Sequence, residues 1–168
     1  MGGIFAKIMP QIIASWSEDE GHKVTLITYM GRENLIKSLP DDIDIVFISS
    51  FTEAAFLSYA LSNLFRSHGP ITALGGPHVR CYPQHAQKYF NYVLGIIDKA
   101  VIKEVLEECQ SHKPSGRFLS AKTKPRELPG VSKIWYFIEQ TLQKAPFIKI
   151  VPLLSSLGCP YTCDFCID

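Results

Sequence analysis

Short apolar runs alternate with helical segments along residues 10–110, and this alternation constrains the fold more than any other feature of the sequence. The runs predict strands because they are short, β-branched and apolar. They lie at Lys23–Tyr29, Ile43–Ser49, Ile71–Leu74 and Tyr92–Leu94. Apolar spacing and proline and glycine positions predict helices from Pro10 to about Glu20 and over Arg32–Leu39, Glu53–Ser67, Pro83–Phe90 and Lys99–Gln110. Strands that alternate with helices indicate an α/β domain with a parallel sheet.

The helix predicted over Glu53–Ser67 has a clear apolar pattern. The positions that recur at helical spacing are Phe56, Leu57, Ala60, Leu61 and Leu64. Residues at this spacing line one face of a helix, so we expect this face to pack on the sheet. Thr52 precedes the helix and is expected to be its N-cap.

Charge and hydropathy exclude several classes of protein. The 168 residues include 17 lysines and arginines against 16 acids, a net charge of +1, which gives no electrostatic basis for general nucleic-acid binding. No apolar run reaches the roughly 18 residues that a membrane helix needs. The N-terminus lacks the charged start and long apolar block of a secretory signal. We therefore expect a cytoplasmic protein that binds neither nucleic acid nor membrane.

The composition changes after residue 110. Ser111–Gly130 is rich in proline, glycine, serine and basic residues and has no apolar period, which predicts a linker over residues 111–132. Lys133–Gln143 is then expected to be helical and Phe147–Leu154 to be a strand, so residues 133–168 would begin a second domain. Because the N-terminus also offers no clear first strand, we expect the sequence to be a piece of a longer protein.

Three of the five cysteines lie within the last ten residues, at Cys159, Cys163 and Cys166. Their spacing is Cys-x3-Cys-x2-Cys. Thiolates are soft ligands that select iron–sulfur clusters, zinc or copper(I). A four-iron cluster held by three thiolates keeps one iron open, and an open coordination position is typical of a metal site that performs chemistry.

A zinc site is the alternative interpretation of these cysteines, and it requires a fourth ligand. Cys81, Cys109 or a histidine would supply that ligand if the fold brings it close. Disulfides fit poorly, because the number of cysteines is odd and nothing indicates secretion. The zinc interpretation corresponds to a binding module with a Rossmann-like domain, a zinc-binding tail and no catalysis.

The segment 158–166, GCPYTCDFC, resembles the cluster loop of radical S-adenosylmethionine (SAM) enzymes, including the aromatic residue before the last cysteine. The resemblance implies that Cys159, Cys163 and Cys166 hold a 4Fe–4S cluster and that Phe165 packs beside the cluster and bound SAM. It also implies reductive cleavage of SAM to a 5′-deoxyadenosyl radical, an electron donor such as flavodoxin or ferredoxin, and a partial (β/α) barrel that begins in residues 133–168. The resemblance leaves the substrate open: a small molecule is expected, but its identity is unknown.

Residues 1–110 resemble the Rossmann-like (flavodoxin-like) cobalamin-binding domain that precedes the barrel in one branch of that superfamily. The matching strings are GHKV at 21–24, DIVFISSFT at 44–52, GGPH at 75–78 and YVLG at 92–95. The resemblance implies that cobalamin binds where the strands end, and that the reaction is a methyl transfer or rearrangement. The candidate cobalamin contacts are Ser49, Ser50, Thr52, Gly75, Gly76 and His78.

This location agrees with general physical expectations. Ligands of open parallel sheets bind at the carboxyl ends of the strands, where glycines let the backbone approach a bulky ligand and hydroxyls offer hydrogen bonds. The chain departs from the family pattern at one point, because it lacks the Asp-x-His-x-x-Gly string whose histidine replaces the lower cobalt ligand. The alternative is a Rossmann-like domain that binds no cobalamin.

Overall fold

The computed structural model describes residues 8–29, 34–144, 163 and 166. The described residues form two compact units. The helical unit comprises those within 1–39 and 125–157, and the sheet unit comprises those within 40–124 and 158–168. The strand predicted over Phe147–Leu154, and with it the start of a barrel, lies outside the described residues.

The sheet unit is built on four parallel strands in the order β1-β2-β3-β4. The strands are β1 (Ile45–Ser49), β2 (Ile71–Gly75), β3 (Tyr92–Leu94) and β4 (Arg117–Leu119). The interior strands β2 and β3 are almost wholly buried, as their continuous apolar sequences require. The structure therefore confirms an α/β, Rossmann-like fold with a parallel sheet.

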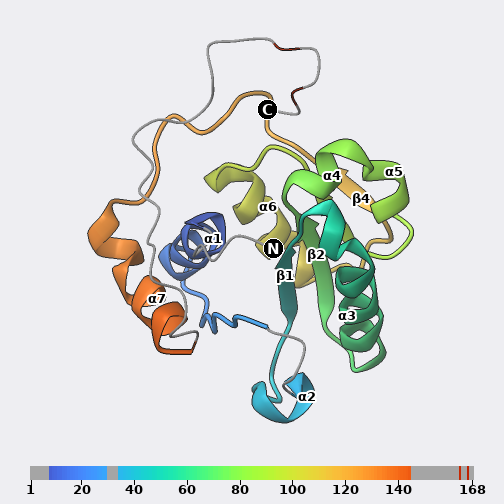
Figure 1. Ribbon diagram of the computed structural model, residues 1–168, viewed down its shortest axis with the longest axis horizontal. Coiled ribbons are helices and arrows are strands. Elements are labelled where there is room, and N and C mark those ends of the chain that lie inside the picture. The colour runs from blue at the N-terminus through green and yellow to red at the C-terminus, as the bar shows by residue number, and fades with distance from the viewer. Residues whose placement is uncertain (1–7, 30–33, 145–162, 164–165, 167–168) are drawn as a thin grey trace. The chain divides into compact units, whose positions relative to one another are not determined.

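Helices cover both faces of this sheet (Figure 1). The helices of the unit are α3 (Ala55–Ser67), preceded by the short 3-10 helix η1 (Thr52–Ala54), then α4 (Pro77–Cys81), α5 (Pro83–Ala86) and α6 (Lys99–Cys109). Figure 1 shows α3 and α6 on opposite sides of the strands. The Asp98 carboxylate caps α6 by accepting a hydrogen bond from the Val101 N–H (2.9 Å). Helices α3 and α6 match the predicted helices, whereas α5 ends four residues before the predicted Phe90.

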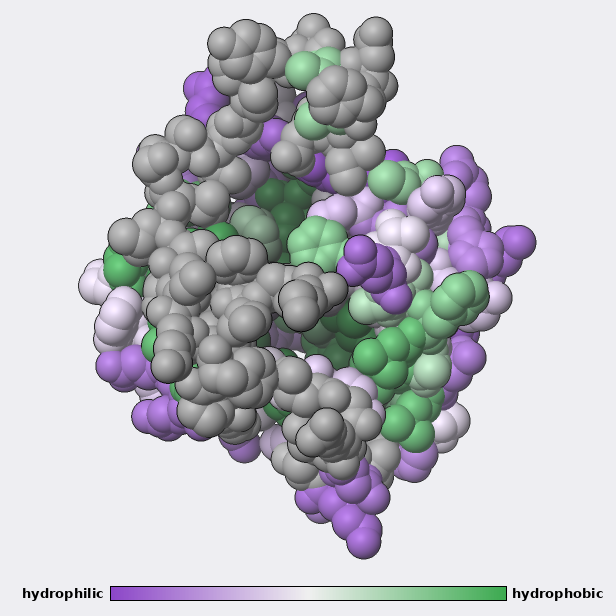
Figure 2. All heavy atoms as spheres, in the orientation of Figure 1, coloured by the Kyte–Doolittle hydropathy of each residue, from purple (hydrophilic) through white to green (hydrophobic). Residues whose placement is uncertain are grey.

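The predicted inward face of α3 is wrong. The residues buried on α3 are Ala55, Ser58, Tyr59, Ser62 and Phe65. Phe56 is 82% exposed, and Figure 2 shows hydrophobic side chains over α3 at the surface. The helix turns this way because its polar side chains find partners inside: the Ser62 hydroxyl donates to the Tyr89 carbonyl (2.6 Å) and bonds the Thr72 hydroxyl (2.7 Å).

Thr52 is also not the N-cap that the sequence predicts. It is the first residue of η1, and no side chain caps either η1 or α3. Its hydroxyl instead lies 3.3 Å from Nδ1 of His78. The short 3-10 turn places the start of α3 three residues beyond Thr52, which removes the geometry of a cap.

Strand β4 falls inside the segment 111–132 that the sequence predicts to be a linker. The strand has only three residues, and Phe118 on it is exposed, so no apolar alternation marks it. Gly116 leads into it with a φ of +68°. A Cβ at this position would lie 2.5 Å from the Gln87 carbonyl oxygen, so the chain can enter the edge of the sheet here only as glycine.

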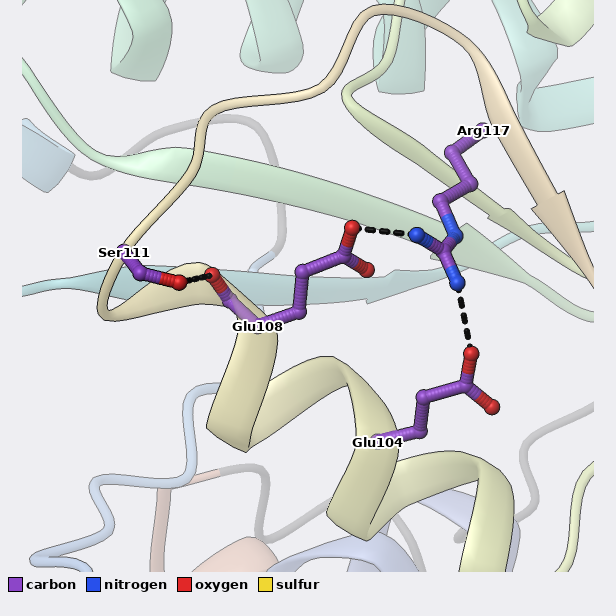
Figure 3. A network of polar contacts seen from close by, with 4 residues as sticks. All are labelled: Glu104, Glu108, Ser111 and Arg117. Atoms are coloured by element: carbon purple, nitrogen blue, oxygen red, sulfur yellow. Dashed lines mark hydrogen bonds and ion pairs between the residues drawn. The ribbon is translucent and has the colours of Figure 1, made fainter.

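An ionic network joins α6 to β4 at the amino ends of the last two strands (Figure 3). Arg117 forms ion pairs with Glu104 (2.6 Å) and with Glu108, and Ser111 donates a hydrogen bond to the Glu108 carbonyl (3.3 Å). Burial, and next the neighbouring Glu108 carboxylate, raise the pKa of Tyr92 well above its usual range. The network therefore supports the edge of the sheet at the end opposite to the predicted ligand site.

The helical unit contains α1 (Ile8–Asp19), α2 (Leu35–Ser38) and α7 (Val131–Lys144). Helices α1 and α7 pack together through buried apolar side chains, which are Ile12 and Trp16 on α1 and Ile134, Phe137 and Ile138 on α7. Lys133 Nζ forms an ion pair with Asp19 (3.0 Å). After α1 the chain turns at Gly21, whose φ is +88°, as predicted for a glycine that ends a helix.

The strand predicted over Lys23–Tyr29 is absent, because residues 22–29 adopt no regular secondary structure. A β-branched run becomes a strand only when a neighbouring strand pairs with its backbone, and the described part of the helical unit contains no other strand. Across the described residues, no helix is long and apolar enough to cross a membrane.

We predict that Asn91→Ala destabilises the protein by about 3 kcal/mol, because three hydrogen bonds of a buried side chain would be lost. Its Oδ1 accepts from the N–H (3.0 Å) and the hydroxyl (3.3 Å) of Thr72, and its Nδ2 donates to the Pro114 carbonyl (2.7 Å). The side chain thus joins the starts of three neighbouring strands. Urea unfolding measures the change, with the exposed Ser67→Ala as control. A loss below about 1 kcal/mol would contradict the assignment.

Candidate functional site at the carboxyl edge of the sheet

Two loops meet where β1 and β2 end. Ser49 and Gly75, the last residues of these strands, are paired in register. The Ser50 N–H donates to the Gly75 carbonyl (3.1 Å), and the His78 N–H donates to the Ser50 carbonyl (3.2 Å). The structure therefore brings together the two segments, 49–52 and 75–78, that the sequence identifies as candidates.

Gly76 makes this close approach possible. Its φ is +101°, and a Cβ there would lie 2.7 Å from the Ser50 carbonyl oxygen and 3.2 Å from the Ser49 hydroxyl. A Cβ essentially never lies as close as 2.7 Å to another heavy atom, so only glycine fits here without moving the loop. Gly75 is different, because a Cβ there would meet only Leu94 at 3.9 Å. Among the described residues, the sheet has room for a side chain at Gly75 and sets no steric requirement for glycine there.

The edge continues over β3 and β4 through residues that are not among the predicted contacts. Gly95 follows β3 and donates its N–H to the Leu119 carbonyl (2.9 Å). The Ser120 hydroxyl accepts from the Ile96 N–H (3.0 Å), and a Cβ at Gly95 would lie 2.8 Å from it. Gly95 could have been found from its place directly after a predicted strand. Ser120 could not, because β4 gave no strand signal.

The predicted serine and threonine contacts have different environments. Thr52 is exposed and Ser49 is half-buried. Ser50 is only 1% exposed, and its hydroxyl donates to the Phe51 carbonyl (2.8 Å). Ser50 therefore holds the loop from inside, whereas the hydroxyl of Thr52 remains accessible from solvent.

His78 lies beneath the loop. Its side chain is buried, with Nε2 2.6 Å from the Tyr59 hydroxyl and Nδ1 3.3 Å from the Thr52 hydroxyl. Burial, and next the nearby His85, lower the pKa of His78, so its ring is neutral at pH 7. Burial, and next Tyr89, raise the pKa of Tyr59. Both ring nitrogens of His78 are engaged within the protein, which gives this histidine a supporting position under Thr52.

The predicted metal ligands are described only in part. Cys163 and Cys166 are exposed thiols outside any disulfide, and the Cys166 N–H donates to the Cys163 carbonyl (2.9 Å). This bond brings the backbones of the two cysteines close together. Cys159 and Phe165 lie outside the described residues. Within the part of the chain that is described, no group of three or more histidine, cysteine or acidic side chains is arranged to hold a metal ion.

The other two cysteines lie apart from such a site. Cys81 is exposed on α4. Cys109 donates its thiol hydrogen to the Leu106 carbonyl (3.2 Å), and burial, followed by the carboxylate of Asp44, raises the pKa of this thiol. A raised thiol pKa disfavours the thiolate that metals bind, so Cys109 has the character of a structural cysteine.

Comparison with known proteins finds distant similarity to a methyltransferase. No protein-family model matches the chain. The chain is 27% identical over 133 residues to the bacteriochlorophyllide d C-8(2)-methyltransferase of Chlorobaculum tepidum. This match covers 75% of the chain and 28% of the length of that enzyme.

A solved structure also shows a weak likeness. The N-terminal domain of a hypothetical protein from Thermotoga maritima matches with a TM-score of 0.45 and 15% identity, covering 72% of this chain and 93% of that one. A likeness of this strength supports no conclusion about function.

We predict that Gly76→Ala destabilises the protein more than Gly69→Ala does. Both glycines have positive φ, +101° and +114°, so both substitutions incur about 1–2 kcal/mol of backbone strain. Only at Gly76 does the new methyl group collide with another loop, because nothing lies within 4 Å of a Cβ at Gly69. Urea unfolding of the two variants measures the difference. Equal losses would show that the two loops do not approach as closely as the structure describes.

Proposed function

We propose that this chain carries the cobalamin-binding sheet and the cluster-binding cysteines of a radical SAM enzyme, with methyl transfer as the reaction class. The Cys-x3-Cys-x2-Cys spacing of Cys159, Cys163 and Cys166 carries the proposal. Two further observations support it: the distant similarity to a methyltransferase and the parallel sheet with glycines at its carboxyl edge. The methyl acceptor and the electron donor, of the flavodoxin or ferredoxin type, belong to the same proposal.

Two features of the carboxyl edge of the sheet support the cobalamin half of the proposal. Gly75 and Gly76 at the end of β2 and Gly95 after β3 keep side chains away from the edge of these two neighbouring strands. A broad macrocycle needs such close access to the backbone. The hydroxyls of Thr52 and Ser120 are exposed beside these glycines and can donate to or accept from the amide groups of cobalamin.

The cysteine segment fits a cluster with one open iron. Cys163 and Cys166 are exposed and joined by a backbone hydrogen bond, so both thiolates can reach one cluster. Cys159 would be the third ligand, and Phe165 would cover the cluster from the side. When bound, the cluster supplies the electron that cleaves SAM, and cobalamin supplies a carrier for the methyl group. In this proposal the role of the chain is to hold and orient these groups.

We predict that anaerobic reconstitution with iron and sulfide loads about four iron atoms per chain. Single substitutions of Cys159, Cys163 or Cys166 by alanine should each remove most of this iron, because each thiolate holds one iron of the cluster. Cys81→Ala is the matched control, since Cys81 is also exposed, and it should retain the iron. Iron analysis and absorption spectroscopy give the readout. A chain that takes up no iron but retains stoichiometric zinc would instead be a zinc-binding module.

We predict that hydroxocobalamin shifts its absorption spectrum when titrated with the full chain, and that Thr52→Val weakens binding by roughly 2- to 10-fold. The valine keeps the shape of the side chain but removes one hydrogen bond worth about 0.5–1.5 kcal/mol. Ser67→Ala, which removes an exposed hydroxyl at the opposite end of α3, should bind as the wild type does. Absence of a spectral shift with the wild-type chain would refute the cobalamin half of the proposal.

A further inference from the structure

Four side chains form a continuous line of hydrogen bonds from the carboxyl edge of the sheet to the surface. Thr52 Oγ1 lies 3.3 Å from His78 Nδ1, and His78 Nε2 lies 2.6 Å from the Tyr59 hydroxyl. The same hydroxyl lies 2.9 Å from Nδ1 of His85. We call these residues the Thr52–His85 chain. They come from four consecutive helices, η1, α3, α4 and α5, and both ends of the chain are exposed.

The middle of the Thr52–His85 chain, which consists of Tyr59 and His78, is held rigidly. The Tyr59 ring stacks on Tyr89 with a centroid distance of 4.3 Å and an interplanar angle of 7°. The rings of Phe90 and Phe56 meet Tyr59 edge-on. Tyr59 and His78 are each only 4% exposed, so water cannot replace the bonds between them. The hydroxyl of Tyr59 must therefore satisfy both histidines from one fixed position.

Hydrogen-bond valence then couples the directions of all three bonds. A tyrosine hydroxyl has one hydrogen, and a neutral imidazole has one N–H and one acceptor nitrogen. If Thr52 donates to His78, then His78 donates from Nε2 to Tyr59, and Tyr59 donates to His85. If His85 donates from Nδ1 to Tyr59, then Tyr59 donates to Nε2 of His78, and His78 donates from Nδ1 to Thr52. Tyr59 could also accept from both histidines, but its buried hydroxyl hydrogen would then have no acceptor, which is costly. Only the two directions above pair every hydrogen in the line.

Protonation of His85 leaves one direction. An imidazolium carries hydrogen on both nitrogens, so Nδ1 of a charged His85 can only donate. Of the two directions that pair every hydrogen, only the second agrees with this donation, and in it Thr52 accepts from His78. The hydroxyl hydrogen of Thr52 is then released to donate to a ligand at the edge of the sheet. In the first direction this hydrogen is used internally, and Thr52 offers only lone pairs.

We propose that protonation of the exposed His85 sets whether Thr52 donates or accepts a hydrogen bond at the carboxyl edge of the sheet, with Tyr59 and His78 as the connection. His85 is thereby a positioning residue for the site. The importance of Thr52 for a ligand rests on the proposed cobalamin function. The coupling along the Thr52–His85 chain does not depend on that function.

The surroundings of His85 suit this role. The titratable groups that face it are Tyr59 from α3, the His78 ring from α4, and Tyr89, whose ring lies 5.4 Å from that of His85. A cation also borders this group, since Arg66 donates to the Tyr89 carbonyl (3.0 Å). Burial, and next the nearby His85, lower the pKa of His78, so the protein disfavours a charge on the His78 ring.

The test reads the tautomer of His78 by long-range ¹H–¹⁵N correlation in the full chain labelled with ¹⁵N-histidine. Spectra are recorded from about pH 8 to about pH 5.5, the range in which histidines in general change charge, and the protonation of His85 is read from its own ring nitrogen signals. We expect His78 to move over the same interval from a mixture of tautomers to Nδ1–H alone. In His85→Gln this change should disappear, whereas His68→Gln, an exposed histidine at the end of α3, should retain it.

Two results would overturn the inference. One is a His78 tautomer that stays constant while His85 titrates, and the other is an unchanged pH response of His78 in His85→Gln. Both measurements are made without ligand. Failure of cobalamin to bind would therefore count against the proposed function and leave the coupling intact, whereas a constant tautomer would remove the coupling alone.

Discussion

The hydroxyl of Tyr59, bonded to both His78 and His85, is the interaction on which the arrangement of the sheet unit depends. It ties α3 to α4 and α5 and fixes the rotation of α3 about its own axis. The magnitudes explain why this rotation is preferred. Leaving Phe56 at the surface forgoes about 1.5–3 kcal/mol of burial. Turning α3 to bury it would strand the hydroxyls of Tyr59 and Ser62, at about 1–3 kcal/mol for each buried polar group left unpaired.

The same interaction reaches the candidate site through His78. The ring of His78 supports Thr52 from below, and its backbone N–H bonds the carbonyl of Ser50. Gly76 allows this contact because it has no side chain between the two loops. A buried tyrosine, a buried histidine and a glycine with positive φ are thus linked in one arrangement, in which the loops after β1 and β2 lie side by side.

The sequence predicted the core of this sheet because its strands are continuous β-branched runs that need no tertiary information to identify. It failed where a tertiary partner decides the outcome. Apolar periodicity cannot reveal that the Ser62 hydroxyl has buried hydrogen-bond partners on Thr72 and Tyr89, and so it assigned the wrong face to α3. It likewise promoted Lys23–Tyr29 to a strand on composition alone, although a strand exists only beside another strand.

The candidate site shows the same division. Ser49 and Gly75 could be predicted because a ligand edge follows from where parallel strands end. The different parts played by Ser50, His78 and Thr52 could not, because they depend on which side chain is buried and which nitrogen has a partner. The position of a hydroxyl at a strand end can therefore be predicted from the sequence, but its hydrogen-bonding role cannot. Its hydrogen-bonding direction is set by residues beneath it, and in this sheet those residues lead back through Tyr59 to the surface.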